Sequence, residues 1–271
     1  MSFATVDQLN WNVISRDLTV QVDGESIKVP FKKAQLRDDT HQVIGVTGKD
    51  YQIFQNSDLK DLVMPAVEEG LLTINNIGYL GVGGKVFIQA EMAESFTMAG
   101  EEHRGMITLM NSHDGTSALA AGVTDTRVIC GNTFAMAMGD MSTRLRHGKN
   151  LHNDAAQITA IMDFVNEGMR VYSESVEALA TTRCDESTVR QLVEFTYGKP
   201  AESVRATNNI IKFFRNGAGN EGRTLYDAVN GFTEYFTHKA GTDDNKRFVS
   251  TNFGRNAVLA RKAFRSALAM V

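Results

Sequence analysis

Apolar and polar residues alternate along much of the first 150 residues, a pattern typical of β-strands that bury one face. Residues with strong turn preferences separate the alternating runs: Asp23-Gly24, the glycine-rich 81–84 and residues 112–115 each favour a tight hairpin. The glycines at 81–84 do not suit a phosphate loop, because such a loop opens a helix and these lie between two predicted strands. The pattern predicts strands at residues 18–22, 26–29, 42–48, 71–80, 85–92, 105–111, 116–124 and 126–130.

One helix is predicted within this strand-rich part, at residues 57–70. Ser57 can cap its start, and Gly70 can close its end in a left-handed conformation. Pro65 lies inside the segment and is expected to kink the helix or to shift its start, because proline lacks a backbone N–H.

After residue 150 the apolar spacing becomes that of helices. From Ile158 to Leu179 apolar residues recur in alternating steps of four and three, which predicts a long helix with an apolar seam. The seam has two interpretations: packing against the rest of the chain, or self-association through residues 158–179. Further helices are predicted after Asp185, at 203–216, at 224–239 and from an Asn256 cap to the end, and 239–247 is predicted to be a mobile polar loop.

These elements predict an α+β fold. The N-terminal half is antiparallel, rich in β-hairpins and contains one helix, and a long helix and a helical C-terminal half follow. The predicted regions are 1–150 and 151–271, either as two domains or as one compact domain.

The composition, 42% hydrophobic and 22% charged, is that of an ordinary globular protein. No apolar run reaches the roughly 18 residues that span a membrane, and the start lacks the basic and apolar regions of a secretory signal. Cys130 and Cys184 stand apart in the sequence, which fits a reducing compartment better than a disulfide framework. We therefore predict a cytoplasmic protein without membrane association.

The net charge of −4 argues against a protein that coats nucleic acid with its whole surface. The charge is uneven, however. Residues 1–150 hold 13 Lys and Arg against 18 Asp and Glu, whereas residues 200–271 hold 11 against 6. The basic C-terminal part is therefore a candidate surface for a polyanion.

Ser112, His113 and Asp114 are the three residue types of a hydrolase triad, here standing side by side. Consecutive residues point in different directions, so they do not easily form the relay in which a base links nucleophile and carboxylate. The stretch suits a hairpin tip whose polar side chains bond to loop amides, and a polar tip of this kind is also a candidate ligand-contact surface. The candidates for ligand contact are Asn111, Ser112, His113, Asp114 and Asn132.

No other motif requires catalysis, a metal or a cofactor. His147 and His152 lack cysteine or carboxylate neighbours, so no zinc site is predicted. The Asp-x-Lys spacings at 58–60, opening a helix, and at 244–246, in a polar loop, lack the strand and second carboxylate of a metal-dependent nuclease. An enzymatic alternative would need side chains that the spacing does not bring together: His113, Asp114, Cys130 and Arg127.

Several segments resemble one known family. LMNSHDGTSAL at 109–119, followed by GVTDTRVICGNTF at 122–134, is similar to the signature of a phage/plasmid-like family, domain of unknown function 932. RHGK at 146–149 and the segments 220–241 and 247–263 also resemble the family, whereas Gly131 stands where glutamine is more usual. The resemblance implies a mobile-element protein in a bacterial host cell and carries no agreed activity. A weaker, fold-level analogy links it to single-strand annealing recombinases of mobile elements.

The first functional hypothesis is binding of single-stranded DNA, extending to annealing or recombination. Aromatic residues interleave with cations at 213–215 and 246–255; aromatic rings stack on bases, and Lys and Arg neutralise phosphates. The alternative is that the aromatics are core: Phe232, Tyr235 and Phe236 have helical spacing, and Phe213 and Phe214 are core candidates as well. The cations of the last helix, Arg261, Lys262 and Arg265, would then be its solvated face. The candidate DNA-binding residues are Arg127, Arg144, Arg146, Lys149, Lys246, Arg247 and Arg255.

The second hypothesis is a non-enzymatic protein-binding module that modulates a host protein. The acidic total charge, the missing catalytic set and the polar hairpin tips favour it. Salt dependence separates the two, because counterion release dominates DNA affinity but need not dominate protein affinity.

Overall fold

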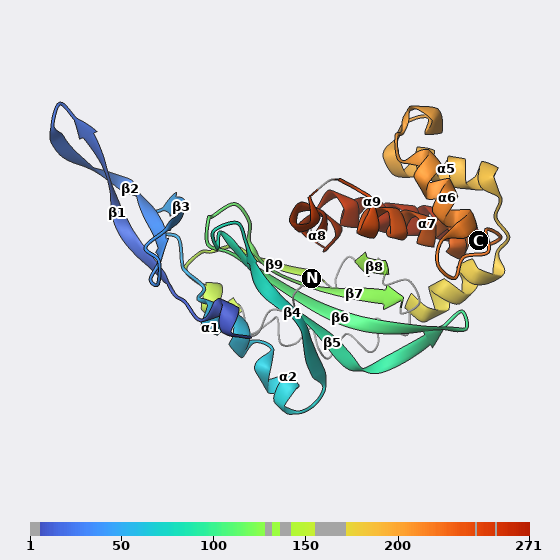
Figure 1. Cartoon of the computed structure of the whole chain (residues 1–271), viewed down its shortest axis with the longest axis horizontal. Helices are drawn as coiled ribbons and strands as arrows, with labels where there is room; N and C mark the ends of the chain where they lie inside the picture. Colours follow the sequence, from blue (N-terminus) through green and yellow to red (C-terminus); the bar gives the residue numbers. More distant parts are fainter. Residues whose placement is uncertain (1–5, 128–131, 136–141, 155–171, 242, 253) are drawn as a thin grey trace. The chain divides into compact units, whose positions relative to one another are not determined.

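The computed structural model describes residues 6–127, 132–135, 142–154, 172–241, 243–252 and 254–271. The chain forms two compact units that are interleaved in the sequence. Unit 1 comprises Met1–Ala93, Ile107–Ala121 and Ser142–Met162, and unit 2 comprises Glu94–Met106, Gly122–Met141 and Asp163–Val271. Antiparallel strands dominate the first part of the chain and helices the second, which confirms the predicted α+β class (Figure 1).

Unit 1 begins with a short 3-10 helix, Val6–Leu9, and a three-stranded sheet in the order β1-β2-β3. The strands are β1 Val13–Val22, β2 Glu25–Arg37 and β3 Val43–Gly48. Asp23 and Gly24 both have positive φ, 52° and 87°, as the predicted tight turn requires. Because β3 pairs only with the second half of β2, the far part of the β1–β2 hairpin extends beyond it as a two-stranded ribbon (Figure 1).

The helix predicted at 57–70 is divided into α1 Asn56–Asp61 and α2 Met64–Glu68. Pro65 lies in the first turn of α2, where its missing N–H costs nothing, so the proline shifts the start of a second helix. The first helix is capped two residues earlier than predicted, by Gln55 and not by Ser57: Asp58 accepts a hydrogen bond from the backbone N–H of Gln55 at 2.7 Å.

The larger sheet has six strands in the order β4-β5-β6-β7-β8, with β9 beside β7. Both predicted hairpins, β4–β5 and β6–β7, are confirmed. The separate strand predicted at 126–130 is wrong in its start, since β7 runs without a break to Arg127, and 128–131 lie outside the described residues. The strands are β4 Leu72–Leu80, β5 Lys85–Met98, β6 Glu101–Ser112, β7 Leu119–Arg127, β8 Asn132–Ala135 and β9 Ser142–Leu145.

The helices of unit 2 follow the predicted segments with shifted ends. Asp185 caps the first by accepting from the Thr188 N–H at 2.9 Å, and Thr224 caps another in a box with Asp227. The predicted loop at 239–247 is wrong at its end, because a helix starts at Asp244. The helices are α5 Glu186–Tyr197, α6 Thr207–Asn216, α7 Leu225–His238, α8 Asp244–Asn252 and α9 Arg255–Leu268, with a 3-10 turn at Ala201–Ser203.

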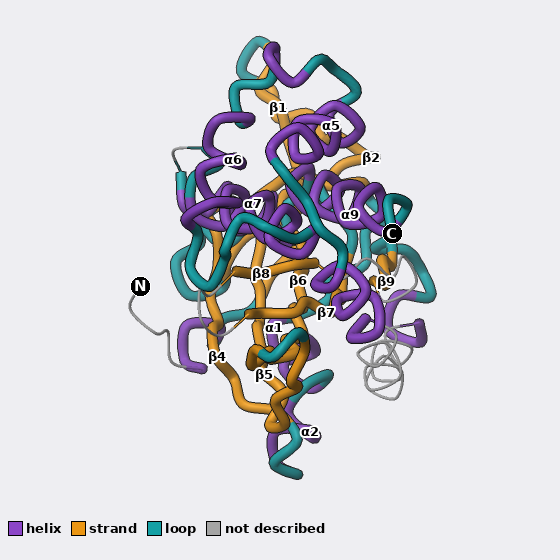
Figure 2. Tube along the Cα trace, turned by 90° about the vertical axis from the view of Figure 1, so that its right-hand side faces the viewer, coloured by secondary structure: helices purple, strands orange, loops and turns teal. Residues whose placement is uncertain are grey.

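The core of unit 2 is built on α7, which packs against α6 and α9 (Figure 2). Phe232 and Phe236 are buried there, as their spacing predicts, and Phe214 of α6 is buried as well. Phe214, one of the aromatics interleaved with cations at 213–215, is therefore a core residue and does not face solvent.

The predicted long helix is described only at its end. Residues 172–181 are helical, and 155–171 lie outside the described residues. Tyr172, Val176 and Leu179 are buried, and the Tyr172 ring stacks on Phe264 of α9 at 5.4 Å. The described part of the seam therefore packs within unit 2, which leaves these three side chains no surface for self-association.

Candidate functional site

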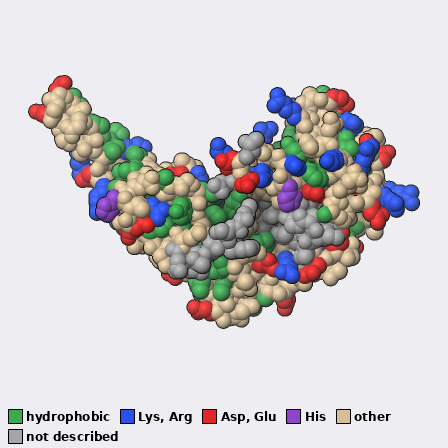
Figure 3. Space-filling view, viewed as in Figure 1, with side chains coloured by type: hydrophobic (Ala, Val, Ile, Leu, Met, Phe, Trp, Pro, Cys, Tyr) green, Lys and Arg blue, Asp and Glu red, His purple; other side chains and the backbone are tan. Residues whose placement is uncertain are grey.

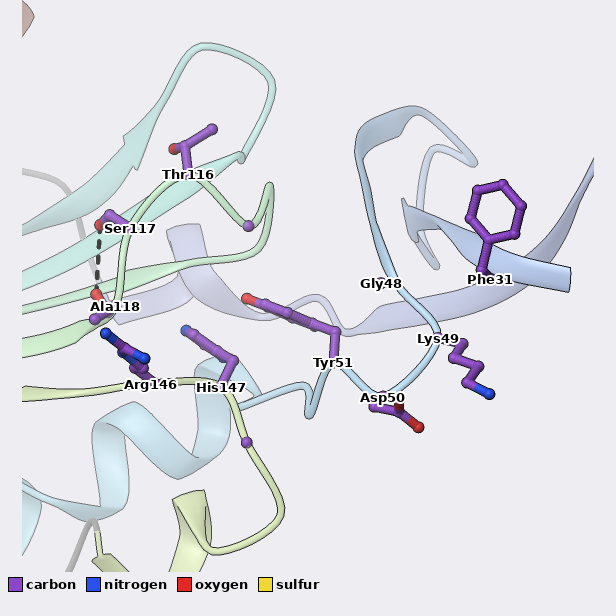
Figure 4. Close-up of a pocket in the computed structure, with 12 residues that line it drawn as sticks. Phe31, Gly48, Lys49, Asp50, Tyr51, Thr116, Ser117, Ala118, Arg146 and His147 are labelled. Atoms are coloured by element: carbon purple, nitrogen blue, oxygen red, sulfur yellow. Dashed lines mark hydrogen bonds between the residues drawn. The ribbon is translucent and has the colours of Figure 1, made fainter. Parts of the chain in front are cut away.

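The surface of unit 1 contains an open cavity of about 750 Å³. Three loops that are far apart in the sequence form it: residues 48–51 after β3, the β6–β7 turn at 115–118, and residues 146–148 after β9 (Figure 4). Phe31 of β2 completes the lining. The loops are held together by the motif segment that lies beneath them.

Asn111, Ser112 and His113 form the buried floor beneath the β6–β7 turn, and each has 0% of its surface exposed. The Asn111 side-chain amide donates to the carbonyl of Phe54 at 2.6 Å. Ser112 Oγ accepts from the N–H of Ser117 at 3.2 Å. These side chains bond to loop backbone, as expected for a hairpin tip, and they are too deeply buried to contact a ligand at the surface.

His113 is enclosed by polar and aromatic partners. Its Nε2 donates to Asn56 Oδ1 at 2.9 Å, and the Asn56 amide donates in turn to the Trp11 carbonyl at 2.8 Å. The Trp11 ring lies edge-on to the imidazole at 5.6 Å. Burial lowers the pKa of His113 to about 3, so the ring is neutral at neutral pH.

Asp114 closes the turn. Its Oδ1 accepts from Ser112 Oγ at 2.5 Å and from the Thr116 N–H at 3.0 Å, while Lys85 Nζ lies 3.6 Å from Oδ2. Burial alone would raise the pKa of this carboxyl, but the hydrogen bonds and Lys85 outweigh it and lower the pKa below the usual value. Asp114 is therefore a carboxylate whose hydrogen bonds stabilise its own turn.

Two glycines allow the turn to sit close to its neighbours. A Cβ on Gly45 of β3 would lie 2.5 Å from the Asp114 Cα, and one on Gly84 would lie 2.9 Å from Asp114 Oδ2. The N–H of His113 also donates to the Gly84 carbonyl at 2.7 Å. The turn is thus clamped between β3 and the β4–β5 hairpin, in a geometry that serves packing.

This arrangement differs from a hydrolase triad. Ser112 Oγ bonds to Asp114, and His113 bonds to Asn56 on another segment, so no base connects the nucleophile to the carboxylate. In the described ranges of the chain, no three His, Cys, Asp or Glu side chains gather as a metal site. Asn132, the fifth contact candidate, lies in β8, and its side chain is outside the described part.

The wall of the cavity is a pair of stacked rings. Tyr51 lies face to face with His147, with 4.5 Å between ring centres and 13° between planes. The Tyr51 hydroxyl donates to the Ser112 carbonyl, and His147 Nδ1 donates to the Gln52 carbonyl at 2.9 Å. Burial is the main cause that lowers the pKa of His147, so this wall is uncharged at neutral pH.

The rim of the cavity carries cations. Lys49 and Arg146 are exposed, and within the described residues neither side chain has an ion-pair or hydrogen-bond partner. Asp50 is the one acidic residue in the lining, which leaves a net charge of one positive unit. The rim therefore offers one ammonium group and one guanidinium group to an anion, and no ion pair among the described residues has to break first.

The predicted DNA-binding residues are distributed over both units. Arg146 lines the unit 1 cavity, and Arg144 and Lys149 are exposed on the same unit. Lys246 and Arg247 line a smaller cavity of about 350 Å³ in unit 2, where Arg247 pairs with Asp244. Arg255 is exposed at the start of α9, and the side chain of Arg127, the last residue of β7, is not among those described.

The sequence does not point to several of the lining residues, among them Phe31, Lys49, Asp50 and Tyr51. The predicted strand ended at residue 29, so Phe31 was not recognised as part of an exposed strand. The adjacent Phe31 and Lys32 form the same kind of aromatic–cation pair that indicates a DNA-binding surface in the C-terminal part. This pair is therefore the sequence signal for Phe31.

A comparison with protein-family models gives one match, to a domain of unknown function, DUF932, over residues 43–262. The chain belongs to this family. The match contains the motif segment, the Tyr51–His147 wall and all helices from α5 to α8. No curated protein and no solved structure matches the chain, and the description of DUF932 assigns no activity. Function must therefore be argued from the site.

With respect to membranes, the described residues contain no helix that is long and apolar enough to cross one.

Proposed function

We propose that this DUF932 protein binds single-stranded DNA through the unit 1 cavity. The observation that carries the proposal is the combination, on one open cavity, of two unpaired cations with an exposed aromatic ring: Lys49, Arg146 and Phe31. Proteins that hold single strands combine a cationic groove that follows the phosphates with aromatic side chains on which bases stack.

The chemistry of the lining supports this choice over a catalytic pocket. Its histidine is kept neutral by burial and its tyrosine hydroxyl is engaged with a backbone carbonyl. The remaining groups that face solvent suit a binding surface: two cations, the Asp50 carboxylate, a phenyl ring and the hydroxyls of the 115–118 turn. Annealing or recombination would follow from such binding and is tested after it.

The test is a fluorescence-anisotropy titration with a labelled dT oligonucleotide of about 20 nucleotides, at about 50 and 200 mM salt. We expect tight binding that weakens steeply as salt rises. The slope of log K against log salt should fall by about 0.7 for each phosphate contact removed, so Lys49→Ala and Arg146→Ala should each flatten it by that amount.

Lys212→Ala is the matched control, since Lys212 is an exposed lysine on α6 of unit 2. Absence of binding at the lower salt concentration would refute the proposal. Equal slopes for the wild type, the two cavity variants and the control would place the DNA elsewhere on the protein.

A second candidate function, binding of a host protein, is favoured by the far part of the β1–β2 ribbon. Val20, Val22 and Ile27 are each nearly half exposed there, and Figure 3 shows hydrophobic side chains on the ribbon surface. Val20 and Ile27 face each other across the two strands, so they form a continuous apolar spot. Replacing both by Thr should abolish capture of a host protein and leave the DNA titration unchanged if this second function operates.

A further inference from the structure

We infer that the unit 1 cavity holds a short segment of a single strand, with one base stacked on Phe31 and separate phosphodiesters paired with Lys49 and with Arg146, which lie on opposite sides of Tyr51 (Figure 4). The inference rests on the proposed function and adds to it which parts of the strand the cavity contacts. The site takes the spaced phosphodiesters of a strand in preference to the adjacent phosphates of a free nucleoside triphosphate, and it takes an unpaired base in preference to a paired one.

The backbone of β2 is bulged where it approaches the cavity. Asp17 pairs with Lys33 and Thr19 pairs with Lys28, so the four residues 29–32 of β2 lie opposite Leu18 alone. Bulges of this kind redirect side chains and are common beside functional sites. The bulge therefore takes residues 29–32 out of regular pairing with β1.

Phe31 is the side chain that the bulge presents. Pro30, which has no N–H for a strand ladder, precedes it within the bulge. The Phe31 carbonyl accepts from the N–H of Lys49 at 3.1 Å, which fixes the bulge to the loop that lines the cavity. The ring itself is 62% exposed, far more than a phenylalanine that serves as core.

The other rings at the cavity are already engaged. Tyr51 and His147 stack on each other. The Tyr51 hydroxyl and His147 Nδ1 donate to backbone carbonyls, while His147 Nε2 is buried without a hydrogen-bond partner among the described residues. Phe31 has no ring partner in the described part of the chain, so its faces are open to a planar ligand. A base has such a face whatever its identity, and stacking on it is therefore tolerant of sequence.

The charge of the lining distinguishes between two ligands that both carry a base, a strand of DNA and a free nucleoside triphosphate. Lys49 and Arg146 contribute two positive charges, Asp50 contributes one negative charge, and His147 is neutral. The two cations lie on opposite sides of Tyr51 (Figure 4), so each suits one of two spaced phosphodiesters along a strand. A nucleoside triphosphate brings several more negative charges, which Asp50 would repel and for which the cavity has no further cation.

The test compares Phe31→Leu with Phe195→Leu in the full-length protein. Phe195 is an exposed phenylalanine of α5 in unit 2 and serves as a matched control for loss of an exposed ring. We expect Phe31→Leu to weaken binding of the dT oligonucleotide about 5- to 150-fold, the range that base stacking on one aromatic ring supplies. Phe195→Leu should bind as the wild type does.

A second variant, Phe31→Trp, keeps a stacking surface and adds a reporter. The natural tryptophan, Trp11, is buried, so a fluorescence change that depends on oligonucleotide would come from the new indole. We expect quenching with near wild-type affinity. Unquenched fluorescence at saturating oligonucleotide would overturn the stacking role of position 31.

Competition with dTTP and with duplex of the same length tests the two preferences. We expect neither to displace the labelled oligonucleotide at concentrations at which unlabelled dT displaces it fully. Displacement by dTTP at equal or lower concentration would overturn the charge argument. Oligonucleotide binding that is identical in wild type, Phe31→Leu and Phe195→Leu would refute this inference and leave the proposed function standing, whereas no binding in any of them refutes both.

Discussion

The floor and the rim of the unit 1 cavity both carry polar or charged side chains, but those on the floor are hydrogen-bonded within the fold and those on the rim are exposed. On the floor, Asp114 accepts hydrogen bonds within its own turn, and Asn56 links His113 Nε2 to the Trp11 carbonyl, while His113 Nδ1 has no hydrogen-bond partner among the described residues. On the rim, Lys49 and Arg146 are exposed and lack such partners within the described residues. Polar groups that satisfy one another hold a fold together, whereas unpaired polar groups at the surface are available to a ligand. The most conspicuous motif of the sequence therefore supports the cavity, and the less conspicuous residues on the rim are the ones that we propose contact a ligand.

The largest expected loss of stability comes from a substitution that pushes the 112–115 turn away from β3. Gly45→Ala places a methyl group 2.5 Å from the Asp114 Cα, a backbone atom that cannot move without displacing the turn. We expect the free energy of unfolding to fall by about 3 kcal/mol, as for overpacked cores. Urea titration measures it, with Gly48→Ala as control, because a Cβ on Gly48 in the same strand meets nothing within 4 Å. Equal loss in both variants would show that the contact with Asp114 is not the cause.

Removing a single hydrogen-bond link on the floor should have the next largest effect. Asn56→Ala leaves the His113 Nε2–H and the Trp11 carbonyl without partners in the interior. We expect a loss of about 2 kcal/mol, within the usual cost of buried polar groups that lose their partner. The same measurement on Asn216→Ala, an exposed position at the end of α6, should show almost no change. A small effect at Asn56 would mean that the imidazole finds another acceptor.

The pH dependence of stability sharpens the contrast further. His113 is neutral in the folded protein down to a pKa of about 3, whereas in the unfolded chain it takes up a proton near 6.5. Between these values the unfolded state binds more protons, so acidification favours unfolding by about 1.4 kcal/mol per pH unit. Comparing unfolding at pH 7.0 and 5.5, we expect a smaller loss in His113→Gln, which can still donate to Asn56 but does not titrate. Identical losses would assign the acid sensitivity to other groups.

The smallest expected effect on stability lies on the rim. Lys49→Ala and Arg146→Ala should change the free energy of unfolding by no more than about 0.5 kcal/mol, because exposed side chains away from special features contribute little. A thermal melt beside the DNA titration shows whether binding is lost without loss of fold. Unfolding of Arg146→Ala would show that this arginine stabilises the fold, and the rim would then not differ from the floor in this respect.

The sequence was a good guide where local chemistry determines structure. Asp23-Gly24 and the glycines at 81–84 mark hairpins because only a few residues tolerate positive φ, and Asp185 marks a helix start because its side chain caps the next turn. It was a poor guide for β8 and β9, four-residue strands without visible alternation, and for α8, whose first residues are polar enough to resemble a loop.

The site was predicted only in part for a different physical reason. Arg146 was named from its charge, and His113 from its residue type, but burial of the floor and exposure of the rim depend on tertiary contacts. The His113–Asn56 bond spans 57 positions, and the His147–Gln52 bond spans 95. No local pattern reports such pairings, so a sequence reading cannot separate a supporting histidine from a contacting one.

The long sequence separation between Tyr51 and His147, the two stacked rings of the wall, also affects when the cavity forms during synthesis on the ribosome. Tyr51 is made 96 positions before His147, so a nascent chain carries Phe31 and Lys49 for most of the first half of translation without the wall that completes their cavity. Contacts of such separation form late, since the entropy of a long loop must be lost first. During that interval the cavity lacks one of its three loops, and we expect it to form only once residues 146–148 have been made. Phe31 and the apolar ribbon stay exposed in the folded protein, so a chaperone that recognises exposed hydrophobic side chains can reach them both before and after the cavity forms.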